Sequence, residues 1–238
     1  MVAGLLRAIA ADIDGTLTLR RGDVRLSVNA IKGVREAERA GVKVILVSGN
    51  SLPVTLGLRT YLGASGPAVA ENGCLVFHEG QVIHVCEGRV PQELVDEAKS
   101  LGLIESWQNP YRVHEVAFHV PRGLRSLDRV IAELRESASR RGMSVLWSGY
   151  AVHINAGRGK AVGVAKAIEL LGLGPEEVAA IGDGENDLDM LRLAAFSGCP
   201  SDAADVVRAS VKFVATRPGG SGFLEFVREV LRRNRGFI

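Results

Sequence analysis

The 238-residue sequence contains no apolar run close to the roughly 20 residues that a membrane-spanning helix needs. Its N-terminus lacks a charged region followed by a cleavable apolar segment, so no secretory leader is expected. The 29 Lys and Arg nearly balance the 27 Asp and Glu, and a net charge of +2 gives no reason to expect nucleic acid or an anionic membrane as a partner. These absences predict a cytoplasmic protein, and a hydrophobic content of 47% suffices for a globular core.

Cysteine is also scarce. Cys74, Cys86 and Cys199 show no CxxC spacing and leave an odd count, so neither a zinc site nor a disulfide framework is implied. If residues 75–77 and 82–85 form a hairpin, Cys74 and Cys86 lie near each other across it. Reduced thiols are the default expectation, and a disulfide would fit a hyperthermophilic source.

The stretch from residue 9 to residue 18 organises the rest of the chain. An apolar run ends abruptly in Asp12 and Asp14, and Gly15 and Thr16 follow at once. Such a run is typical of a strand buried on both faces of a parallel sheet. Two acids at its end repel each other and lose hydration unless a cation lies beside them, and a hard divalent metal is the expected cation. The stretch therefore predicts a Mg²⁺ site.

The first 70 residues alternate between strands and helices. A helix over residues 28–40 leads to a buried strand at 42–47, and a second helix at 51–62 leads to a short strand at 67–70. This alternation predicts parallel strands with helices on both faces of the sheet. Ligands of such sheets bind in the crevice outside the carboxyl ends of the strands.

The alternation stops at the hairpin over residues 74–86 and resumes near residue 156. Between them the patterns predict helices at 91–101 and 124–140 and strands at 113–120, 144–147 and 151–155. The predicted fold is α/β: a Rossmann-like, doubly wound, mainly parallel sheet formed by residues 1–86 and 156–238, with a small α+β domain inserted at residues 87–155.

The second half of the parallel pattern begins with a helix at 160–171, a strand at 178–181 and a polar loop at 182–187. A further helix, two short strands near residue 196 and at 211–214, and a final helix at 222–233 follow. The glycine-rich segment 219–222 before that helix is interpreted as a flexible connection.

Polar residues collect where these strands end and where one helix starts. They are Asp12, Asp14, Ser48, Lys160, Asp183 and Asp187. Carboxylates with one hydroxyl and one ammonium suit Mg²⁺ and a phosphoryl group, because oxygen-only ligands favour Mg²⁺ and the cations neutralise charge during phosphoryl transfer. One carboxylate could attack phosphorus and the other could move the proton.

Four ordered segments resemble the motifs of the haloacid dehalogenase (HAD) superfamily of phosphatases: residues 12–18, Ser48, Lys160 and residues 182–187. The insertion between the second and third motifs is similar to the type-2 cap of the Cof-like branch. Within that branch, the small cap, the segment 48–50 and the segment 71–73 are most similar to archaeal-type phosphoglycolate phosphatases. Many Cof-like relatives have Arg where this chain has Asn50, so a substrate contact made by that Arg is not expected here.

The resemblance implies a role for each matching residue. Asp12 is the expected nucleophile and Asp14 the expected general acid and base. The expected substrate contacts are Ser48, Gly49, Lys160 and Asn186. The expected Mg²⁺ ligands are Asp12, the backbone carbonyl of Asp14, Asp183 and, as ligand or orienting group, Asp187.

The implied activity is Mg²⁺-dependent hydrolysis of a phosphomonoester through an aspartyl-phosphate, with 2-phosphoglycolate converted to glycolate. A sugar-phosphate phosphatase or phosphomutase of the same superfamily is the alternative. A non-catalytic, receiver-like phosphoaspartate module is a third hypothesis, and Asp14 argues against it, because a base aimed at water shortens the life of a phosphoaspartate. The expected partner is a small phosphorylated metabolite, and a homodimer is left open.

Substrate choice is expected to depend on the inserted domain. Trp107, Tyr111, Arg112 and His114 lie where a cap could meet substrate. The five histidines share no metal spacing, so surface or structural roles are expected for them.

Overall fold

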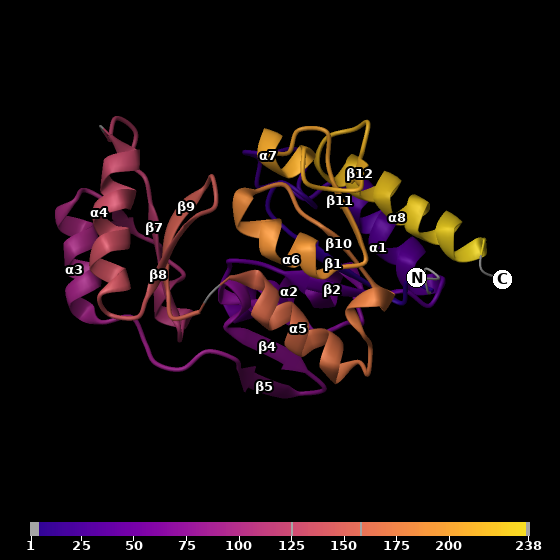
Figure 1. Cartoon of the computed structure of the whole chain (residues 1–238), viewed down its shortest axis with the longest axis horizontal. Coiled ribbons are helices and arrows are strands. Elements are labelled where there is room, and N and C mark those ends of the chain that lie inside the picture. Colours follow the sequence, from indigo (N-terminus) through magenta and orange to yellow (C-terminus); the bar gives the residue numbers. More distant parts are fainter. Residues whose placement is uncertain (1–4, 125, 158, 237–238) are drawn as a thin grey trace.

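A computed structural model describes residues 5–124, 126–157 and 159–236 and contains two β-sheets (Figure 1). The larger sheet has eight strands in the order β12-β11-β10-β1-β2-β3-β4-β5. They are β1 (Ala8–Asp12), β2 (Lys43–Val47), β3 (Ala68–Ala70), β4 (Leu75–His78), β5 (Gln81–His84), β10 (Val178–Ile181), β11 (Phe196–Cys199) and β12 (Phe213–Val214). Pairing is parallel from β12 to β3 and antiparallel for β4 and β5, which confirms the predicted mainly parallel sheet.

Helices cover both faces of this sheet because side chains of β1 alternate between two cores. Ile9 and Ala11 pack in one cluster with residues of α1 (Val28–Arg39), α2 (Leu52–Leu62) and α8 (Gly219–Arg235). Ala8 and Ala10 pack in the other, with α5 (Lys160–Leu170), α6 (Leu188–Leu193) and α7 (Asp205–Arg208). Every residue of β1 is buried, as expected for a central parallel strand.

The smaller sheet lies within the predicted insertion and is antiparallel, in the order β6-β7-β9-β8. Its strands are β6 (Ile104–Glu105), β7 (Glu115–His119), β8 (Ser144–Trp147) and β9 (Ala151–Asn155). Helices α3 (Gln92–Ser100) and α4 (Leu127–Ser139) cover its outer face (Figure 1). Arg125, at the start of the helix predicted over 124–140, lies outside the described residues.

Alternation along β7 and β9 decides what the inner face of the small sheet presents. Phe118, Val152 and Ile154 pack with α3 and α4 in a separate apolar cluster. The intervening residues of the same strands therefore face away from these helices.

The predicted flexible connection at residues 219–222 is wrong, because these residues form the first turn of α8. The N–H of Gly219 donates to Asp202 Oδ1 at 3.0 Å, and that of Gly220 donates to the carbonyl of Thr18 at 2.8 Å. A Cβ at Gly219 would lie 2.4 Å from that same carbonyl oxygen. The glycines thus permit close backbone packing at a helix start.

The default expectation of reduced thiols is also wrong for two of the three cysteines. Cys74 and Cys86 form a disulfide, and Cys199 is free and buried. In the β4–β5 hairpin Leu75 pairs with His84, which leaves the two cysteines just beyond the paired residues with Cα atoms 4.8 Å apart. Within the described part of the chain, no helix is long and apolar enough to cross a membrane.

Candidate active site

The predicted polar residues meet at the carboxyl edge of the large sheet. Asp12 is the last residue of β1, Ser48 follows β2 directly, Asp183 lies two residues after β10, and Lys160 is the first residue of α5. A cavity of about 500 Å³ opens at this edge. Its core side is lined by Asp12, Asp14, Gly49, Lys160, Asp183, Asn186 and Asp187. Because the carboxyl ends of parallel strands lie at the same edge of the sheet, residues that are far apart in the sequence meet in one site.

Lys160 is buried between two carboxylates. Its Nζ donates to Asp12 Oδ1 and to Asp187 Oδ1, each at 2.5 Å. Burial lowers the pKa of Lys160, but the charges of Asp12 and Asp187 and the hydrogen bonds to them outweigh burial, so its pKa is raised. The ammonium is therefore held charged beside the carboxylate of Asp12.

One lysine does not neutralise this cluster. Asp12, Asp183 and Asp187 each offer a carboxylate oxygen, and these oxygens lie within 4.8 Å of one another. Burial and the charge of Asp187 raise the pKa of both Asp12 and Asp183. The buried Oδ2 of Asp183 has no hydrogen-bond partner among the described residues, and Arg21 Nε lies 3.4 Å from it as an ion-pair partner. Buried carboxylates that repel one another and offer only oxygen donors fit a hard divalent metal ion.

Asp187 differs from the other two acids because both of its oxygens are engaged. Oδ1 accepts from Lys160, and Oδ2 accepts from the backbone N–H groups of Asp183 and Gly184, each at 2.9 Å. The side chain thereby fixes the loop that carries Asp183. This geometry favours an orienting role over direct ligation for Asp187.

Asp14 is connected to the insertion through Asn50. Asn50 Nδ2 donates to Asp14 Oδ2 at 2.8 Å and to Ser48 Oγ at 2.9 Å, while Asn50 Oδ1 accepts from Gln108 Nε2 at 2.8 Å. Burial raises the pKa of Asp14, and the hydrogen bond from Asn50 opposes this rise. Ser48 itself is fully buried and does not line the cavity.

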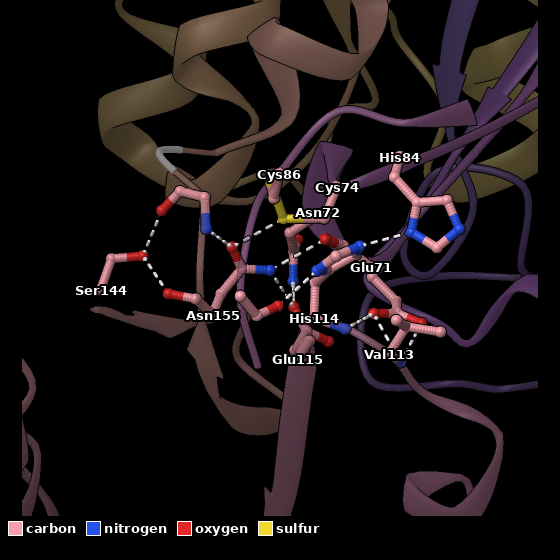
Figure 2. The surroundings of a disulfide bond; sticks show 12 residues. Glu71, Asn72, Cys74, His84, Cys86, Val113, His114, Glu115, Ser144 and Asn155 are labelled. Atoms are coloured by element: carbon pink, nitrogen blue, oxygen red, sulfur yellow. Dashed lines mark hydrogen bonds between the residues drawn. A yellow bond between two sulfur atoms is a disulfide. The ribbon is translucent and has the colours of Figure 1, made fainter. Parts of the chain in front are cut away.

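The junction between the two sheets is built around the 3-10 turn η1 (Glu71–Gly73) (Figure 2). Glu71 and Asn72 have positive φ angles of 50° and 49°. This turn aims the Glu71 carboxylate at the backbone N–H groups of Val113 and His114, from which it accepts at 2.7 to 3.1 Å. The disulfide lies beside this turn, and a Cβ on Gly157, in the returning connection, would lie within 2.7 Å of both sulfur atoms.

Glu115 is the anion at the centre of this junction. It is buried and accepts hydrogen bonds from Asn72, Arg112, His153 and Asn155. Burial raises the pKa of Glu115, but the charges of His153 and Arg112 and these hydrogen bonds outweigh it and lower the pKa to about 2. The junction carboxylate is therefore ionised and fully satisfied.

The four candidate specificity residues divide into two pairs. Trp107 and Arg112 line the cavity, whereas Tyr111 and His114 do not. A ring nitrogen of His114 lies 2.8 Å from one of His84, and its other nitrogen lies 2.7 Å from the carbonyl oxygen of Gly88. His114 is thus a structural residue of the junction.

A family model described as haloacid dehalogenase-like hydrolase matches residues 9–106 and 113–227. The chain belongs to this family. The HAD-like core accounts for the site geometry, since the matched residues include both sheets and all of the acids that line the cavity.

Relatives of this HAD-like chain cover nearly its full length. It is 45% identical over 97% of its length to a phosphoglycolate phosphatase of Aeropyrum pernix, 95% of which is covered. It is 42% identical over 95% of its length to a phosphoglycolate phosphatase of Metallosphaera sedula, all of which is covered. The crystal structure of Thermoplasma acidophilum 0175 superposes with a TM-score of 0.85 at 30% identity, covering 96% of this chain and 99% of that one.

Sequence reasoning about this HAD-like chain missed Gln108, Glu115 and His153 as site residues. Gln108 and His153 line the cavity, and Glu115 holds His153 through a 2.8 Å hydrogen bond. The alternation of apolar and polar residues within 113–120 and 151–155 could have indicated these residues. The apolar face of each strand packs against helices, so the polar face points away from them.

Proposed function

We propose that this protein is a Mg²⁺-dependent phosphomonoester hydrolase that converts 2-phosphoglycolate to glycolate through an aspartyl-phosphate on Asp12. The observation that carries the reaction is the buried cluster at the cavity, in which Asp12 lies against the ammonium of Lys160 and near Asp183 and Asp187. The relatives named phosphoglycolate phosphatase, at 45% and 42% identity over nearly the whole chain, support the substrate.

Asp12, the backbone carbonyl of Asp14 and Asp183 would hold the Mg²⁺, and Asp187 would orient the loop behind it. The Oδ2 of Asp183, which accepts no hydrogen bond from a described residue, and the oxygen-only donor set support this assignment. When bound, the metal would supply positive charge to the phosphoryl oxygens and lower the repulsion between substrate and the acids.

Side chains of the protein perform the nucleophilic attack and the proton transfers. The Asp12 carboxylate attacks phosphorus, the bond between phosphorus and the glycolate oxygen breaks, and Asp14 donates its proton to that oxygen. Asp14 then takes a proton from water, whose oxygen attacks phosphorus. The bond between phosphorus and the Asp12 oxygen breaks, which releases inorganic phosphate and restores the Asp12 carboxylate. Burial raises the pKa of Asp14, which favours the protonated form that the first step needs.

Phosphate oxygens would be held by Lys160, the Gly49 backbone and Asn186, which line the cavity, and by the hydroxyl of Ser48, which is buried beside Gly49. Ser48 Oγ accepts from the backbone N–H and side chain of Asn50, so its hydroxyl proton remains to be donated to a phosphate oxygen. Residues 87–155 would act as a cap whose inner sheet face closes the cavity and excludes bulk water during transfer.

The proposal is tested by phosphate release from a panel of phosphorylated metabolites, with Mg²⁺ and with EDTA. We expect 2-phosphoglycolate to be hydrolysed at the highest kcat/KM, and EDTA to abolish turnover until Mg²⁺ is restored. Hexose phosphates cleaved far faster would favour the sugar-phosphate alternative. A phosphorylated protein that persists for hours without releasing phosphate would favour the receiver-like module.

A further inference from the structure

We propose that Arg112 binds the carboxylate of the substrate and thereby sets its specificity for a phosphorylated carboxylic acid. This inference rests on the proposed function. It names the residue of the insertion that would bind the end of the substrate remote from phosphorus.

Arg112 is held at the boundary between the cavity and the junction. Its side chain is only 2% exposed. Nη1 donates to the carbonyl of Gly49 at 2.8 Å and to Glu115. Glu115 is held in turn by Asn72, Asn155 and His153. The guanidinium is therefore fixed in position by both the large sheet's loop and the insertion.

The opposite edge of the guanidinium has no acceptor in the described structure. Nε is buried and has no hydrogen-bond partner, and Nη2 makes no hydrogen bond with any described residue. Nε and Nη2 form the fork that matches the two oxygens of a carboxylate. A buried donor without an acceptor destabilises the protein, and a bound carboxylate would remove that cost.

The position of Arg112 suits a very short substrate. In 2-phosphoglycolate only the ester oxygen and one methylene separate phosphorus from the carboxylate carbon. A residue that binds the carboxylate must therefore lie next to the residues that hold the phosphate. Arg112 donates to Gly49, which directly follows Ser48, and it lines the same cavity as Asp12 and Lys160.

The other cations that line the cavity are less suited to this task. Lys160 is held by Asp12 and Asp187. His153 donates or accepts through Nδ1 at Glu115, and His119 lies at the exposed end of β7. Among the described residues that line the cavity, Arg112 is the one guanidinium.

The test compares two substrates in matched variants. The first is 2-phosphoglycolate, and the second is 2-hydroxyethyl phosphate, which has a hydroxymethyl group in place of the carboxylate. We expect Arg112→Gln to lower kcat/KM for 2-phosphoglycolate about 10- to 100-fold, mainly by raising KM, since a hydrogen bond to a charged group contributes about 1.5–3 kcal/mol. For 2-hydroxyethyl phosphate we expect less than about a threefold change, because that substrate has no carboxylate for the fork to bind.

Two further variants separate recognition from structure. Arg112→Lys keeps the charge without the fork and should recover only part of the loss. Arg129→Gln, on the exposed face of α4, is the matched control and should leave both substrates unchanged. If Arg112→Gln does not fold, the double variant Arg112→Gln with Glu115→Gln removes both charges of the buried pair, so that no unpaired charge is left. It should show the same substrate-dependent loss.

The two proposals fail in different ways. If wild type prefers 2-phosphoglycolate and Arg112→Gln slows both substrates equally, Arg112 only supports the cap and this inference is wrong, while the proposed function stands. If wild type itself shows no preference for 2-phosphoglycolate over 2-hydroxyethyl phosphate, the proposed substrate is wrong and the inference falls with it.

Discussion

The acid cluster at the sheet edge and the junction around Glu115 are both buried, charged and rich in hydrogen bonds, yet their electrostatics are opposite. At the sheet edge, burial and mutual repulsion raise the pKa of Asp12 and Asp183. At the junction, cations and amides outweigh burial and lower the pKa of Glu115. Buried carboxylates that repel one another are typical of a cation-binding site, whereas a carboxylate with all of its hydrogen bonds made is typical of a structural connection.

The comparison is tested most strongly at Lys160. We expect Lys160→Met to lower kcat/KM at least about 1,000-fold, because Asp12 loses its cationic partner. We expect the free energy of unfolding in the absence of metal to fall by about 3–5 kcal/mol, because two buried carboxylates lose their counter-ion. Steady-state kinetics and urea unfolding measure both effects.

The matched control for this change is Lys166→Met, on the same helix, whose ammonium pairs with the more exposed Glu169. It should change both quantities little. A Lys160→Met protein of unchanged stability would show that the acid cluster is not held together by this ammonium.

Glu115 should carry a stability contribution that depends on pH. Its pKa of about 2 in the folded state lies below the ordinary 4.5, so the ionised form stabilises the fold above pH 4.5 and this contribution is lost as pH falls toward 2. At pH 7 we expect Glu115→Gln to lower the free energy of unfolding by about 3–5 kcal/mol. The difference from wild type should shrink between pH 4.5 and 2.

Urea unfolding at several pH values measures this difference. Glu133→Gln, on the more exposed face of α4, is the control and should follow wild type. A difference that stays constant down to pH 2 would contradict the lowered pKa of Glu115.

The disulfide should affect stability more than chemistry. The bond closes a loop with a sequence separation of 12. Cys74→Ser with Cys86→Ser should lower the free energy of unfolding by about 2–4 kcal/mol and leave kcat within about threefold. Denaturant unfolding with and without a reductant checks this, and added reductant should bring wild type to the stability of the variant. A reductant that leaves wild type unchanged would show that the disulfide contributes nothing to stability.

The smallest effect is expected at Gln108. Gln108→Ala removes the donor that fixes the Asn50 amide, which in turn donates to Asp14. The variant also loses the acceptor of the Ser51 N–H. We expect kcat to fall about 3- to 10-fold, since the loss of the neutral hydrogen bond to Asn50 costs about 1 kcal/mol. Gln92→Ala, on the exposed side of α3, is the control. An unchanged kcat would show that Asn50 holds Asp14 without help from the insertion.

Sequence predicted the acid cluster well because its members end strands or begin a helix, and parallel topology brings those positions together. Asp12, Asp183 and Lys160 needed no knowledge of side-chain contacts. The junction was not predictable in the same way. Glu115 meets Asn72 and Asn155 from distant parts of the chain, and their meeting depends on the positive φ angles of η1 and on how the insertion packs.

The disulfide and the start of α8 were missed for a related reason. Cysteine count and spacing made reduced thiols the default, although the predicted hairpin already placed Cys74 near Cys86, and local composition suggested a flexible glycine segment. The hairpin register brings the two cysteines into bonding distance, and the close approach of Gly219 to Thr18, which is a tertiary contact, fixes the start of α8.

Trapping of the covalent intermediate tests the central claim most directly. Wild-type protein is mixed with 2-phosphoglycolate and Mg²⁺, quenched in acid within one turnover, and digested for mass spectrometry, in parallel with Asp12→Asn and the exposed-site control Asp205→Asn. The account predicts a phosphoryl group on Asp12 in wild type and in the control, and none in Asp12→Asn, which should also release no phosphate. Phosphate release by Asp12→Asn at the wild-type rate, or a phosphoryl group on another residue, would contradict it.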